Sequence, residues 1–125
     1  MSTGAENGEF QRPEVIYLDS AHLAGEVLLE MEQAWRLLPK GGVLWGDDFN
    51  LPDVKQDVLK FTTLYEHTLD DALGDDAWPT ATLARPRPGL YVSYQRRQWF
   101  LRKTVEPGEE SVPEHLLAQR GRTDD

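Results

Sequence analysis

Two short, wholly apolar runs flank a segment with helical periodicity near the start of this chain. The runs are residues 15–18 and 43–45, and a continuous apolar run of this length is typical of a parallel strand covered on both faces. Between them, apolar residues recur at helical spacing while charged ones fall mostly on the other face: Leu23, Val27, Leu28, Met31, Ala34, Trp35 and Leu38. The pattern predicts a strand, a helix over 22–38 and a parallel strand, which is one βαβ unit.

Proline and glycine mark where these elements begin and end. Pro39 cannot continue the first helix, and the Gly41-Gly42 pair permits a tight reversal into the second strand. A second helix is expected from Pro52, whose missing N–H costs nothing in a first turn, with Asn50 or Leu51 as its cap. Its apolar residues extend the helix to about residue 67: Val54, Val58, Phe61 and Leu64 or Tyr65.

The pattern changes in the second half of the chain. Residues 68–88 are rich in Asp, Gly and Pro, which indicates a loop with one helical turn at most. Residues 90–94 and 99–103 predict an antiparallel hairpin, so the expected sheet order is first, second, fourth, third strand. Residues 1–12 are expected to be a flexible tail, 13–104 the folded domain, and 105–125 a charged, disordered tail with a short helix at 113–119.

Composition and charge narrow the possible classes of protein. With 125 residues, 39% of them hydrophobic, and no cysteine, the chain fits one small globular domain and excludes disulfides and cysteine-based metal sites. It has no run of about 18 apolar residues and no signal peptide, so we expect no membrane span and a cytoplasmic location. The net charge of −9 argues against nucleic-acid binding by the whole surface.

Three stretches of the sequence resemble one known family. They are 18–22 (LDSAH), which precedes the helix with Trp35 near its end, 38–42 (LPKGG), and 45–49 (WGDDF), which precedes the second helix. Together they are similar to the C-terminal half of class I, Rossmann-like S-adenosylmethionine-dependent methyltransferases that act on small molecules. The likeness covers about 13–104. Its most specific parts are the D-x-x-H motif at Asp19 and His22 and the Gly-Gly pair that comes shortly before Asp47-Asp48.

The resemblance also implies what this chain lacks. Family members begin with a strand and a glycine-rich loop that cradles S-adenosylmethionine, but the only glycines before Pro13 are Gly4 and Gly8. We therefore expect an α/β partial Rossmann-like three-layer sandwich, with two parallel strands and a C-terminal antiparallel hairpin, lacking the N-terminal cofactor-binding half. Methyl transfer to a small molecule is the implied activity, and the chain is expected to be incomplete or inactive alone.

The acidic residues after the two apolar runs are the candidate site. Carboxylates at the carboxyl ends of neighbouring parallel strands converge on the crevice where open α/β sheets bind ligands. Asp19, Asp47 and Asp48 could there hold Mg²⁺ or another divalent cation. The resemblance implies the same, because metal-dependent O-methyltransferases place an acid and an Asp-Asn pair at these positions. His22 matches the family's histidine and is a candidate ligand or general base, with Asp19 as a second catalytic candidate.

Purely structural interpretations of the same residues remain open. Asp19 and Ser20 can cap the first helix, and Asp47-Asp48 can cap or flank the start of the second, because acids are favourable near a helix N-terminus. His22 is equally compatible with a surface position. The tryptophans Trp35, Trp45 and Trp99 are expected in the core. The acids between residues 70 and 76 do not match a calcium-binding loop and suit a solvated surface.

Two further hypotheses concern partners. Residues 77–105 hold six basic residues and no acid, interleaved with aromatic residues, and such a mixture can bind a nucleic-acid strand, although strand aromatics more often pack a core. A half sheet would also leave residues 15–18 as an apolar edge. We therefore expect self-association, or a separate chain that supplies the missing half-sheet. A non-catalytic binding or assembly module on the same half-fold is the alternative to an enzyme.

Overall fold

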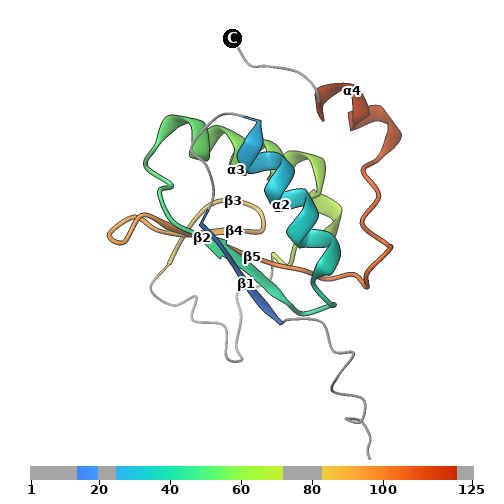
Figure 1. Ribbon diagram of the computed structural model, residues 1–125, viewed down its shortest axis with the longest axis horizontal. Coiled ribbons are helices and arrows are strands. Elements are labelled where there is room, and N and C mark those ends of the chain that lie inside the picture. Colours follow the sequence, from blue (N-terminus) through green and yellow to red (C-terminus); the bar gives the residue numbers. More distant parts are fainter. Residues whose placement is uncertain (1–13, 20–24, 72–82, 121–125) are drawn as a thin grey trace, which may run out of the picture.

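Five strands form one mixed sheet in the order β1-β2-β5-β4-β3, with helices packed against it (Figure 1). The computed structural model describes residues 14–19, 25–71 and 83–120. The strands are β1 (Val15–Leu18), β2 (Val43–Gly46), β3 (Ala84–Arg87), β4 (Leu90–Ser93) and β5 (Gln98–Arg102). The helices are α2 (Glu26–Leu37), α3 (Pro52–Leu64) and α4 (Leu117–Arg120), with 3-10 turns η1 (Glu66–Thr68) and η2 (Glu114–Leu116).

The pairing of the strands confirms the α/β class and the predicted strand order. β1 and β2 are parallel, with Val15 opposite Val43, and β5 pairs antiparallel with both β2 and β4. The edge strand β3 was not predicted from the sequence, because its four residues, Ala-Arg-Pro-Arg, show no alternation of apolar and polar side chains. Pro86 is tolerated there because an edge strand needs ladder hydrogen bonds on one side only.

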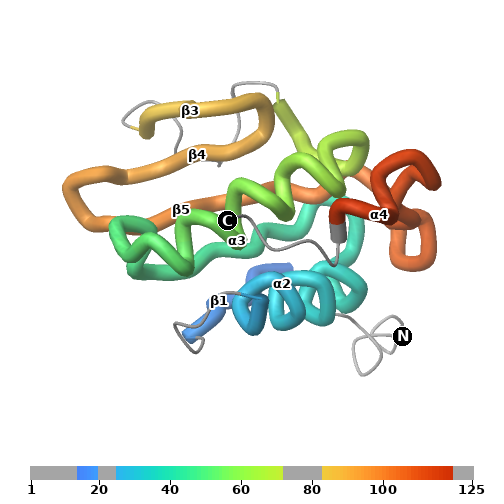
Figure 2. Tube along the Cα trace, turned by 90° about the horizontal axis from the view of Figure 1, so that it is seen from above, coloured from blue at the N-terminus to red at the C-terminus, as the bar shows by residue number. Residues whose placement is uncertain are grey.

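Helices α2 and α3 cover the same face of the sheet (Figure 2). On that face lie the buried strand residues Leu44, Trp99 and Leu101, which join both helices in one hydrophobic core. The opposite face carries an aromatic row in which the Trp45 ring lies 4.6 Å from Tyr17 and 5.8 Å from Phe100, measured between centroids. The described residues thus form two layers, whereas a three-layer sandwich was expected.

The core contains most of the aromatic residues that the sequence assigned to it. Trp35 and Trp99 are buried, as predicted, and Trp35 meets the Phe61 ring edge-on at 5.3 Å. Trp45 is half-buried on the other face of the sheet. Burial of such large rings supplies much of the hydrophobic stabilisation of a domain this small. Within the described part of the chain, no helix has the length and apolar character needed to cross a membrane.

The start of α2 is bound by a carboxylate from another helix. α2 begins at Glu26. Its N-cap residue is Gly25, with φ 90°, which makes no side-chain capping hydrogen bond. Instead, Asp57 of α3 accepts hydrogen bonds from the backbone N–H groups of Gly25 (2.6 Å) and Leu28 (3.1 Å). Burial raises the pKa of Asp57, and these two bonds offset part of that rise. The predicted cap from Asp19 is therefore wrong for α2, while Ser20 lies outside the described residues.

The end of α2 is bound by a buried lysine. Lys103, which follows β5, is 1% exposed, and its Nζ donates to the carbonyls of Trp35 (2.7 Å) and Leu38 (2.7 Å). The same Nζ forms an ion pair with Glu110 at 2.6 Å. Burial raises the pKa of Glu110, but the bonds from Lys103 and from the Gly108 N–H outweigh burial and leave this pKa below its ordinary value. All three donor positions of the ammonium are thus used.

The C-terminal segment packs beside this lysine. η2 and α4 confirm the short helix predicted near 113–119. Ahead of them, the Ser111 carbonyl lies 2.8 Å from His67 Nε2, and Val112 and Leu116 pack against the core. Residues 105–112 therefore bring Glu110 back to Lys103 at the C-terminal end of α2.

Replacing Lys103 tests how strongly this ion pair holds the fold. We expect Lys103→Ala to lower the free energy of unfolding by about 3 kcal/mol or more, because Glu110 and two helix carbonyls lose their buried donor. Glu110→Gln is the matched control, and we expect a smaller loss of about 1 kcal/mol because the amide oxygen still accepts from Lys103. Urea unfolding followed by circular dichroism measures both. Equal losses would show that the helix carbonyls gain nothing from Lys103.

Candidate functional site

The carboxyl ends of β1 and β2 carry the candidate site. The parallel register places Leu18 opposite Gly46, so Asp19 and Asp47 follow at neighbouring strand ends. Asp47 Oδ2 accepts a hydrogen bond of 2.5 Å from the Tyr17 hydroxyl, and Asp47 Oδ1 accepts one of 3.2 Å from Gln98 Nε2. Three strands, β1, β2 and β5, therefore position this one carboxylate.

The Tyr17 phenol is affected by all three candidate acids. The hydrogen bond to Asp47, then burial, then the negative charges of Asp47, Asp19 and Asp48 raise the pKa of Tyr17 to about 12. All three candidate carboxylates thus act on one hydroxyl group. Tyr17 is 43% exposed, so this group is accessible from solvent.

Asp48 sits in an unusual backbone conformation at the β2–α3 turn. Its φ is 65°, in the left-handed region that aspartate tolerates better than most residues. The turn is held by the hairpin, because the Phe49 N–H donates to the Arg97 carbonyl at 2.9 Å. Arg97 also has a positive φ, of 62°. Two strained turns therefore contact each other beside the acids, a feature common at functional sites.

Neither Asp47 nor Asp48 is the N-cap of α3, although both precede its start. Leu51 is the N-cap of that helix, as the sequence allowed, and no side chain makes a capping hydrogen bond there. The Asp47 carboxylate is instead bound by Tyr17 and Gln98.

The Trp99 ring packs so closely against the backbone of residue 46 that only glycine fits there. A Cβ atom at Gly46 would lie 2.6 Å from the Trp99 ring, a distance that no side chain tolerates. The Trp99 ring, 1% exposed, therefore fills the space on the helix side of the strand end. Trp99 Nε1 is buried and has no hydrogen-bond partner in the described part of the chain. This explains why glycine precedes the Asp-Asp pair.

The sequence singled out Asp19, Asp47 and Asp48 but not Tyr17 or Gln98. Tyr17 precedes Asp19 by two residues, and this spacing on a strand puts both on one face, which was a usable signal. Gln98 had none, because its position depends on the hairpin register. His22 lies outside the described residues. Within the described ranges, no three His, Cys, Asp or Glu side chains form a group that could hold a metal ion.

The basic hairpin is largely engaged with its own chain. Arg85 forms an ion pair with Asp71, and Arg102 lies 3.9 Å from Asp70. Tyr91 and Trp99 are buried, as the core interpretation of strand aromatics predicted, so neither ring can stack on a base.

Comparisons with known proteins add no assignment. A scan of the chain against protein-family models gave no match, and neither did a search of curated proteins.

The Tyr17–Asp47 bond can be tested by tyrosine titration. We expect Tyr17 to titrate at about 12, and we expect Asp47→Asn to lower this pKa because the strongest acceptor and one negative charge are lost. NMR of ¹³Cζ-labelled tyrosine, with Tyr17→Phe to assign the signal, measures the change. Asp53→Asn, which removes an acid from the first turn of α3, should leave the Tyr17 signal unchanged. An equal shift in both variants would indicate a general charge effect.

Proposed function

We propose that this chain forms the acceptor side of an S-adenosylmethionine-dependent methyltransferase site that acts on a small molecule. The observation that supports this most is the convergence of Asp19, Asp47 and Asp48 around Tyr17 at the carboxyl ends of two parallel strands. Such ends are where open α/β sheets bind ligands. The sequence motifs that resemble this family fall on the same residues.

The donor does not fit on the described residues. A methyl donor in such a fold needs a glycine-rich loop after a strand, and Gly46 at the end of β2 is covered by Trp99. We therefore place no part of S-adenosylmethionine on β1 or β2. The same holds for a divalent cation, because no set of ligands is assembled among the described residues. The donor would have to be held by other residues or by another polypeptide.

The described residues have clear tasks in such a site. Asp47 is already paired with a hydroxyl group, so an acceptor hydroxyl can replace that of Tyr17 at Asp47 Oδ2 and be oriented by it. Asp19 is exposed and can take the proton that the acceptor loses. His22 remains a predicted base. Gln98 fixes the second oxygen of Asp47 and limits rotation of the carboxylate.

Calorimetric titration with S-adenosylmethionine, with and without Mg²⁺, tests the proposal. We expect S-adenosylmethionine to bind to the tagged chain when it is isolated from its source cells together with its bound partner proteins. We expect no binding to the chain purified alone and shown to be folded by circular dichroism. No binding by either preparation contradicts a role in methyl transfer. Binding by the chain alone would contradict the divided site, because the chain would then hold the donor itself.

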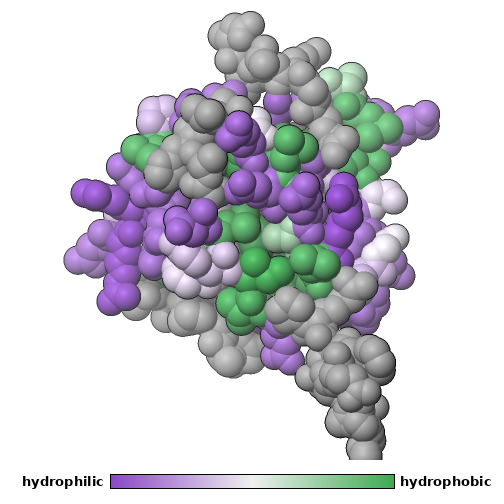
Figure 3. Space-filling model, in the orientation of Figure 1, coloured by the Kyte–Doolittle hydropathy of each residue, from purple (hydrophilic) through white to green (hydrophobic). Residues whose placement is uncertain are grey.

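A second candidate function is assembly through the β1 edge. Among the described strands β1 ends the sheet and pairs only with β2, and an edge of this kind can accept another strand. Exposed apolar side chains occur on β1 and on α2: Val15 (57%), Leu29 (55%) and Leu37 (52%). Figure 3 shows apolar surface gathered over β1 and the neighbouring end of α2. A strand from a second copy, or from a chain that extends the sheet, would cover this edge.

Light scattering at tens of micromolar tests the assembly function. We expect the chain to form a dimer or larger species, and Val15→Lys to shift it toward monomer, because a charge on an edge strand opposes further pairing. Tyr94→Lys is the matched control, since Tyr94 is equally exposed (59%) but lies at the hairpin turn. A stable, soluble monomer of the unmodified chain would contradict self-association.

A further inference from the structure

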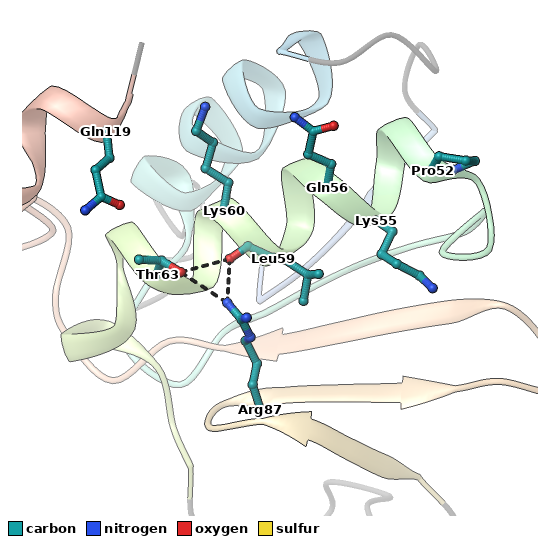
Figure 4. A pocket seen from close by; sticks show the side chains of 8 residues that line it. All are labelled: Pro52, Lys55, Gln56, Leu59, Lys60, Thr63, Arg87 and Gln119. Carbon is teal, nitrogen blue, oxygen red and sulfur yellow. Dashed lines mark hydrogen bonds between the residues drawn. The ribbon is translucent and has the colours of Figure 1, made fainter. Parts of the chain in front are cut away.

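A shallow groove crosses the exposed side of α3, away from the acidic strand ends. Its volume is about 570 Å³, within the range of small-molecule sites. α3 forms its floor, Arg87 of β3 and Gln119 of α4 lie at its borders, and Lys55 and Lys60 project from α3 on opposite sides (Figure 4). Three segments of the chain therefore contribute to one groove.

The charge of this groove is opposite to that of the molecule. Its lining includes three cations, Lys55, Lys60 and Arg87, and no acidic residue. The whole chain has 22 acidic residues against 13 basic ones and a net charge of −9. A purely cationic groove is therefore unusual on this surface, and it would attract an anionic ligand that the rest of the protein repels.

The Arg87 guanidinium is fixed in place by α3. Its Nη1 donates to the Leu59 carbonyl (3.1 Å) and to the hydroxyls of Thr62 (3.2 Å) and Thr63 (3.1 Å). Its Nη2 and Nε donate to no residue in the described part of the chain. A guanidinium already held by one nitrogen can offer the other two to a phosphate. Because the side chain is already ordered, binding costs little further conformational entropy.

Other polar groups at the groove also have donors to spare. The Lys55 ammonium lies 5.5 Å from the centre of the Phe49 ring, and it forms no ion pair or hydrogen bond with the described residues. The side-chain amides of Gln56 and Gln119 likewise have no hydrogen-bond partner in those ranges. The Leu59 side chain lies between Lys55 and Arg87 (Figure 4), where it offers an apolar contact.

From this arrangement we infer a binding site for a small phosphorylated molecule. Arg87 binds the phosphate, and the flexible Lys55 side chain turns away from Phe49 to join it. Lys60 adds positive charge, and the uncharged part of the ligand lies against Leu59 and Pro52. The site uses α3, β3 and α4, so it does not depend on the function proposed for the ends of β1 and β2. Free phosphate and a phosphate monoester share this chemistry, and the experiment separates them.

Titration of the ¹⁵N-labelled chain, followed by NMR, tests the site. The probes are inorganic phosphate, ribose 5-phosphate and, as the uncharged control, ribose, all at about 0.15 M salt so that exposed charges are screened. We expect saturable shifts at Gln56, Thr63 and Arg87 Nε, with a Kd of about 1 mM or lower for the monoester. Tighter binding of the monoester indicates a phosphorylated organic ligand, and equal binding indicates free phosphate as the natural one.

Lysine variants distinguish a built site from general charge attraction. Arg87 also ties β3 to α3, so its removal could disturb the fold, and Lys55→Gln is the better test. We expect Lys55→Gln to weaken binding about fivefold through loss of a charge-assisted bond. Lys40→Gln removes an exposed lysine in the α2–β2 connection and should leave binding unchanged. Equal weakening by both variants would overturn the site, as would the absence of saturable shifts up to about 20 mM phosphate.

Discussion

The buried ammonium of Lys103 is the interaction on which the arrangement of this fold depends. It joins the end of α2, the end of β5 and the C-terminal segment through Glu110. The backbone of the same residue exchanges hydrogen bonds with Gly41 and Gly42, which fixes the start of β2. Removal of a lysine from water is costly, and full use of its three donors offsets that cost. Lys103 thus helps to fix the direction in which β2 leaves α2.

Acidic and basic side chains gather at different places around α3. The acids at the ends of β1 and β2 lie before this helix begins, and the cations of the groove lie along its exposed side. Asp57 belongs to neither group, because it faces the core and binds the start of α2. α3 therefore lies between the acidic strand ends and the cationic groove. Its buried side holds the start of α2 through Asp57.

Local patterns were sufficient to predict most of the elements. The apolar runs at 15–18 and 43–45, the helical spacing of Val27 to Leu38 and the hairpin together predicted the order β1-β2-β5-β4 that the sheet has. β3 was missed because its residues have no apolar pattern, whereas the missed side-chain contacts share another cause, which is distance along the chain. Asp57 binds residues about 30 positions earlier, and Lys103 resembled one more charge of a basic hairpin. At the site, the rule for parallel strands found Asp19 and Asp47, whereas Gln98 depended on a register 51 residues away.

The two supports of α2 have a consequence for the order in which the chain folds. α2 is made early, yet its first N–H groups wait for Asp57 and its last carbonyls wait for Lys103. A twelve-residue helix is marginal by itself in water. We therefore expect α2 to be unstable while only the βαβ unit has left the ribosome. We expect the domain to become stable late in synthesis, once the segment that carries Glu110 has emerged.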